Sequence, residues 1–125
     1  MGHELKTLRV YELGPETEGY RILVDRLWPR GLRKEALEPF VWAKDIAPTS
    51  GLRKWFGHDP DRFEEFASRY QEELERSPYA EEFARGVGEI LHDQDVLLLY
   101  AAKDKEKNQA VVLKKWLEKR LGPGS

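Results

Sequence analysis

The sequence contains no cysteine, and this absence removes a set of chemistries from consideration. Disulfide bonds, thiolate nucleophiles and cysteine-ligated zinc or iron–sulfur sites are excluded. The absence also fits a protein of the reducing cytoplasm. Residues 1–10 hold no apolar run typical of a secretory signal, and the longest apolar run, residues 96–102, is too short to cross a membrane. We therefore expect a cytoplasmic protein without membrane association.

Several catalytic patterns are missing as well. The histidines His3, His58 and His92 show no metal-ligand spacing, and no Gly-rich phosphate loop or dinucleotide fingerprint is present. The serines lack the flanking glycines of a nucleophile elbow. We expect neither a metal site nor a bound cofactor.

What the chain does contain is enough apolar material for one core. Four Trp, five Tyr and five Phe stand among 125 residues, and a second core in this length could not bury enough surface. We expect a single domain over residues 1–125, ordered from about 6 to 121, with residues 122–125 as a tail. The charge is uneven: residues 21–58 carry eight Lys/Arg against four Asp/Glu, whereas residues 59–95 carry four against twelve. Residues 96–125 return to seven against three, so two basic segments flank an acidic middle, and this asymmetry says more about partners than the net charge of −2 does.

Apolar runs predict the strands of a small sheet. Residues 20–25 and 96–101 are typical of strands buried on both faces, and residues 8–12 alternate like a third strand. A fourth could lie within residues 40–46. The connection between residues 12 and 20 is short for a parallel crossover, so we expect the first two strands to be antiparallel.

Helical spacing and start signals predict the rest of the chain. We expect helices over residues 50–56, 59–76, 77–91 and 107–121, and a helical turn near 34–38. Ser50 and Asp59 are the expected caps of the first two. This order of elements predicts an α/β (or α+β) fold, with a small mixed, mainly parallel, Rossmann-like sheet and helices packed on it in layers.

Polar side chains follow both apolar strands, where ligands bind in open α/β sheets. Asp25 and Arg26 follow the first strand, and Lys103 and Asp104 follow the second. Two structural alternatives remain open. Asp25 and Arg26 could form an ion pair that fixes the loop, and Asp104 or Asn108 could cap the last helix.

His58 and the tryptophans add further candidates. His58 could act as a general base oriented by Asp25, although a structural role is as well supported. Trp28, Trp42 and Trp55 stand among arginines and lysines, a pattern that suits phosphates or stacked bases as well as a plain core. The near-neutral net charge makes nucleic acid a less favoured partner than a small phosphorylated ligand, without excluding it.

Seven segments carry a resemblance that covers about residues 8–117. They are Arg9–Tyr11, Leu23–Gly31 (which ends in the D-R-L-W-P-R-G run), Trp42–Pro48, Leu52–Arg53 with Trp55–Phe56, His58–Pro60, Arg69–Tyr70 and Leu98–Asp104. The chain resembles the YeaO-like branch of the domain-of-unknown-function family 488. The resemblance implies a cytosolic α/β protein and a shared set of motif residues, but no activity. Other branches carry cysteines after the last strand, where this chain has Tyr100 and Ala102, so thiol chemistry does not carry over.

Three hypotheses follow for function, and whether the protein is an enzyme stays open among them. The favoured one is a cleft that binds or acts on a small anionic ligand, clamped by arginines. The others are a structural or interaction domain and a single-stranded nucleic-acid-binding module. The candidate catalytic residues are Asp25 and His58, and the candidate ligand-binding residues are Arg26, Trp28, Arg30, Lys44, Asp45, Arg53, Lys103, Asp104 and Asn108. Oligomeric state is not predicted.

Overall fold

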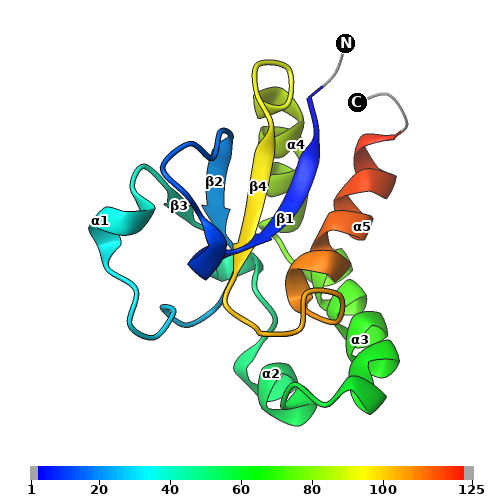
Figure 1. Ribbon diagram of the computed structural model, residues 1–125. Coiled ribbons are helices and arrows are strands. Elements are labelled where there is room, and N and C mark those ends of the chain that lie inside the picture. The colour runs from blue at the N-terminus through cyan, green and yellow to red at the C-terminus, as the bar shows by residue number, and fades with distance from the viewer. Residues whose placement is uncertain (1–2, 123–125) are drawn as a thin grey trace.

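A four-stranded parallel sheet forms the centre of the molecule (Figure 1). The computed structural model describes residues 3–122, so most of the predicted tail at 122–125 lies outside the described residues. The strands are β1 (Leu5–Arg9), β2 (Tyr20–Leu23), β3 (Val41–Trp42) and β4 (Val96–Tyr100). Their order is β1-β4-β2-β3, and each of the three pairings is parallel. The possible strand within residues 40–46 is therefore confirmed as β3.

The antiparallel arrangement predicted for the first two strands is wrong. β4 lies between β1 and β2 and pairs in parallel with both. Residues 10–19 link β1 to β2 without an α-helix, through a single 3-10 turn at Val10–Glu12. Extended chain advances about 3.3 Å per residue, so even this short link can return along the sheet, as Figure 1 shows in blue. The predicted strand at residues 8–12 also starts earlier and ends at Arg9, because its register with β4 pairs Leu5 to Val96 and Arg9 to Tyr100.

The predicted helices are confirmed to within a few residues. They are α1 (Lys34–Leu37), α2 (Ser50–Phe56), α3 (Phe63–Arg76), α4 (Ala80–Ile90) and α5 (Gln109–Leu121), with 3-10 turns at Lys44–Ile46 and Pro60–Arg62. Thr49 rather than Ser50 caps α2, because its hydroxyl accepts from the Leu52 N–H at 3.3 Å. Asp59 caps the turn that leads into α3, as expected.

Two apolar layers hold the sheet, and this confirms the α/β architecture. Helices α3, α4 and α5 cover one face, where Phe66, Tyr70 and Leu113 pack with Ile22 and Leu98 of the sheet. The other face is covered by α1 and the loops, and it carries a second cluster of Val10, Leu23, Leu37, Leu97 and Leu99. All five residues of β4 are buried, which explains why its sequence is apolar throughout rather than alternating. None of the helices in residues 3–122 combines the length and apolar character needed to span a lipid bilayer.

Candidate functional site

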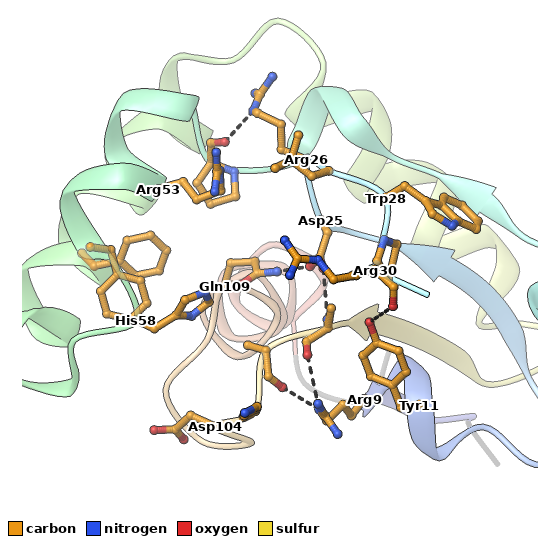
Figure 2. A pocket seen from close by; sticks show the side chains of 18 residues that line it. Arg9, Tyr11, Asp25, Arg26, Trp28, Arg30, Arg53, His58, Asp104 and Gln109 are labelled. Atoms are coloured by element: carbon orange, nitrogen blue, oxygen red, sulfur yellow. Dashed lines mark hydrogen bonds between the residues drawn. The ribbon is translucent and has the colours of Figure 1, made fainter. Parts of the chain in front are cut away.

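A pocket of about 810 Å³ lies at the carboxyl ends of the strands (Figure 2). Because β2 and β4 are neighbours and parallel, the polar residues that follow each strand come together there. Eight of the eleven predicted site residues line this pocket: Asp25, Arg26, Trp28, Arg30, Arg53, His58, Lys103 and Asp104. The polar residues that follow the apolar strands therefore lie together at one pocket.

Three predicted residues lie elsewhere. Lys44 is exposed, with its ammonium nitrogen 4.5 Å from the centre of the Trp42 ring. Asp45 is exposed and borders a second, smaller hollow beside α3. Asn108 is fully buried and caps α5: its Oδ1 accepts from the Val111 N–H at 3.1 Å and its Nδ2 donates to the Asp104 carbonyl at 2.8 Å. Asn108 therefore caps the last helix, which was the structural alternative to ligand binding.

Asn108→Ala is expected to lower the free energy of unfolding by about 1–2 kcal/mol, because it removes a helix cap and the side-chain donor to the Asp104 carbonyl. Urea unfolding measures the effect. Ser50→Ala is the matched control, since Ser50 is exposed and Thr49 makes the cap there. Equal stability of the Asn108→Ala protein and the parent would contradict the structural role.

Asp25 joins three elements beneath the pocket. Its carboxylate accepts from the Ala101 N–H at 3.0 Å, after β4, and from the side-chain amide of Gln109 on α5. Burial raises the Asp25 pKa to about 6, and the two hydrogen bonds only partly oppose that rise. The ion pair between Asp25 and Arg26 considered above is not among the contacts of the described residues. The Arg26 guanidinium instead donates to the carbonyls of Pro48 at 2.8 Å and Ala47 at 3.4 Å.

Arginines dominate the charge of the pocket. Arg9 donates to the carbonyls of Ala101 and Ala102 at 3.3 and 3.0 Å, so it holds the loop after β4 while keeping its positive charge. Among the described residues, no acidic side chain pairs with Arg9, Arg26, Arg30 or Arg53, since the ion pairs found there involve other groups. The pocket therefore holds four guanidinium groups that form no ion pair with a carboxylate of the described residues.

Arg53 has the least satisfied side chain in the pocket. It lies on α2, and its Nε is buried without a hydrogen-bond partner in the described part of the chain. Figure 2 shows its guanidinium near the pocket, across from that of Arg30. A buried N–H that belongs to a permanent cation is costly to leave unpaired. Arg53 is the residue to which a bound acceptor would contribute most.

His58 takes an unusual backbone conformation at the edge of the pocket. Gly57 ends α2 with φ +52°, and His58 follows with φ +59°. Both lie in the left-handed region of backbone conformation, which residues other than glycine seldom adopt. The His58 ring packs 6.1 Å from that of Phe56. His58 and Asp25 both line the pocket, but no hydrogen bond joins them, and Asp59 is engaged as a cap. Such backbone strain is found at binding and catalytic sites more often than elsewhere.

The tryptophans do not form one shared surface. Trp28 donates its indole N–H to the Leu32 carbonyl at 2.7 Å and packs 5.5 Å from both Phe40 and Trp42, so much of it belongs to the second apolar layer. Trp42 donates to the Asp25 carbonyl at 2.7 Å, which fixes the backbone beneath the pocket. Trp55 lies under the guanidinium groups of Arg62 and Arg69. This arrangement does not favour a stacking surface for nucleic-acid bases.

The loop after β4 places a second carboxylate at the pocket. Asp104 accepts from the backbone N–H groups of Glu106 and Lys107, both at 2.9 Å, and these bonds lower its pKa. Asp104 therefore stays ionised down to a lower pH than Asp25 does. Lys103 beside it is exposed and adds positive charge at the rim.

Arg9, Tyr11 and Gln109 line the pocket but were not predicted. The Tyr11 hydroxyl donates to the Arg30 carbonyl at 2.7 Å, which joins the link after β1 to the loop after β2. The position of Arg9 at the end of a strand is a signal of the kind used for Asp25. Gln109 does not follow a strand, so its sequence position did not indicate a place in the pocket. It reaches Asp25 because of the direction in which α5 runs.

Within residues 3–122, no group of three His, Asp or Glu side chains is placed to hold a metal ion. The pocket offers two carboxylates, and each is already occupied by protein hydrogen-bond donors. The groups it presents to a ligand are guanidinium, ammonium and imidazole. These suit an anion.

Fold and pocket together define a small parallel α/β protein with an arginine-lined pocket at its strand ends. A family model described as "Inactive DUF488-N3 subclade" matches residues 4–124, and the chain belongs to this family. The match confirms the resemblance to the YeaO-like branch.

Curated relatives match over almost their whole length. The uncharacterized protein Rv3073c of Mycobacterium tuberculosis is 40% identical over 116 residues, covering 93% of this chain and 95% of its own. The uncharacterized protein YeaO of Escherichia coli is 40% identical over 109 residues, covering 87% of this chain and 92% of its own. The names of these relatives assign no activity, and no solved structure matches the chain.

Proposed function

We propose that this protein binds a small anionic ligand, best a phosphorylated one, in the pocket at the ends of β2 and β4. The observation that carries the proposal is the buried Arg53 Nε without a hydrogen-bond partner. A guanidinium is always charged and presents its N–H groups as a planar fork that matches an oxyanion. A bound oxyanion would supply the missing acceptor and balance the charge.

The neighbouring cations support the same conclusion. Arg30 and Lys103 line the pocket, and neither side chain forms a hydrogen bond or ion pair with the described residues. Arg9 and Arg26 give their hydrogen bonds to carbonyls, which leaves their charge available to a ligand. Cations without protein counter-charges attract an anion, and the attraction is stronger for partly buried cations such as Arg9 and Arg26 than for the same groups in water.

Binding without turnover is the form of the proposal that the family favours, since the matching subclade is described as inactive. Asp25 and His58, the residues proposed above for proton transfer, share the pocket without a hydrogen bond between them. The proposal also places this binding in the cytoplasm, as the lack of cysteine led us to expect.

The test is a thermal unfolding series with inorganic phosphate and with sulfate on the parent protein and on Arg53→Met. At a ligand concentration near 100 times Kd, the parent is expected to gain roughly 5–10 °C in Tm. Arg53→Met keeps the apolar stem but removes the unpaired N–H, so it is expected to melt no lower than the parent without ligand and to lose the response.

Arg85→Met is the matched control, because Arg85 is an exposed arginine on α4 that does not line the pocket. It is expected to respond to the anions as the parent does. An undiminished response in Arg53→Met, or none in the parent, would contradict the proposal.

A further inference from the structure

The pocket offers more than positive charge. Its volume of about 810 Å³ falls in the range of roughly 300–1,000 Å³ found for pockets that enclose drug-sized molecules. A simple oxyanion held by Arg53 would leave most of this space to solvent. The lining therefore has room for a further part of the ligand.

Leu27 and Tyr11 supply an apolar surface in the same pocket. They line it with 58% and 43% of their surfaces exposed, and both belong to the short set of large apolar side chains that the fold leaves outside its core. Apolar side chains left exposed together in a concave site are typical of ligand contacts.

Tyr11 is held in place. Its hydroxyl donates to the Arg30 carbonyl at 2.7 Å, and the Arg9 guanidinium lies 4.8 Å from the centre of its ring. Figure 2 shows Tyr11, Arg9 and Arg30 at the same side of the pocket. A fixed ring requires little ordering when an apolar group packs beside it, which favours binding.

We propose, building on the anion binding proposed above, that the ligand is an amphipathic organic anion. Its anionic group lies at Arg53 and Arg30, and its apolar or aromatic body packs against Leu27 and Tyr11. The class of ligand is thus an organic phosphate with a hydrophobic substituent rather than a free inorganic ion.

Calorimetric titrations with inorganic phosphate, methyl phosphate and phenyl phosphate test this. Phenyl phosphate is expected to bind the parent about tenfold more tightly than methyl phosphate, because its ring buries apolar surface at Leu27 and Tyr11. Leu27→Ser is expected to bring phenyl phosphate to the affinity of methyl phosphate while leaving methyl phosphate unchanged. Val41→Ser is the matched control, since Val41 is 42% exposed on β3 and does not line the pocket.

The outcomes separate the two proposals. If methyl and phenyl phosphate bind equally, or if the preference survives in Leu27→Ser, the amphipathic ligand is overturned while anion binding stands. If none of the three compounds binds the parent, both proposals fail. Leu27→Gln, a second polar variant at this exposed position, is expected to lose the preference as well, and an unchanged Tm in either variant shows that the fold is intact.

Discussion

Asp25→Asn is expected to stabilise the protein at pH 8 by about 2–3 kcal/mol and to change its stability little at pH 4. Burial raises the Asp25 pKa from 3.8 to about 6, so the ionised carboxylate is disfavoured in the folded protein. Asparagine keeps an oxygen to accept from the Ala101 N–H, and Gln109 can turn its amide to suit. The substitution removes the charge and keeps the contacts.

The sign follows from proton binding. Between pH 4 and pH 6 the folded protein holds a proton on Asp25 that the unfolded chain has already released, so the contribution of Asp25 to stability falls as the pH rises through this window. A shift of roughly two pKa units corresponds to about 3 kcal/mol, all of it lost above the folded pKa. Below pH 4 both states are protonated and the contribution is complete.

Urea unfolding of the parent and Asp25→Asn from pH 4 to pH 8 measures this difference. Asp45→Asn is the control, because Asp45 is an exposed aspartate outside the pocket, and its curve is expected to run parallel to that of the parent. If Asp25→Asn were less stable than the parent at pH 8, the carboxylate would be a net stabilising group and the account of Asp25 would be wrong.

Sulfate is expected to bind the parent about tenfold to a hundredfold more tightly at pH 5 than at pH 8. Asp25 lines the pocket, and its negative charge repels a bound anion by on the order of 1–3 kcal/mol once solvent and salt screening are included. Protonation of Asp25 removes this repulsion. Sulfate is the suitable probe because its own charge is constant over this pH range.

The other charged groups of the pocket determine which control variants this experiment needs. Arginine and lysine side chains keep their charge throughout, and Asp104 stays ionised because backbone hydrogen bonds lower its pKa. His58 also lines the pocket, so the series is repeated on His58→Gln. Asp25→Asn is expected to bind sulfate at pH 8 as the parent does at pH 5. A pH dependence that persists in Asp25→Asn and vanishes in His58→Gln would assign the effect to His58 instead.

Much of the fold could be predicted because its signals are local. The apolar run at β4, the Asp59–Pro60 start before α3 and Gly57 after α2 each specify their own element. The direction of β1 could not be predicted in the same way. It depends on pairing between Leu5–Arg9 and a strand some ninety residues away in the sequence. The residues of the short link after Arg9 do not indicate which strand β1 pairs with.

The same distinction separates the site residues that could be predicted from those that could not. Asp25, Arg26 and Lys103 were found because they follow apolar strands directly, so the carboxyl edge of a parallel sheet had to bring them together. Gln109 was missed because its contact with Asp25 depends on how α5 packs against the sheet. Asn108 was placed at the ligand, but its side chain turns back into the helix terminus, a direction that residue type alone does not specify.

A crystal structure of the protein grown with sulfate at pH 5 tests the central claim most directly. The account predicts a sulfate in the pocket with an oxygen within hydrogen-bond distance of the Arg53 Nε and a second oxygen at the Arg30 guanidinium. A pocket without sulfate while Arg53 donates to a carbonyl or carboxylate of the protein would contradict it.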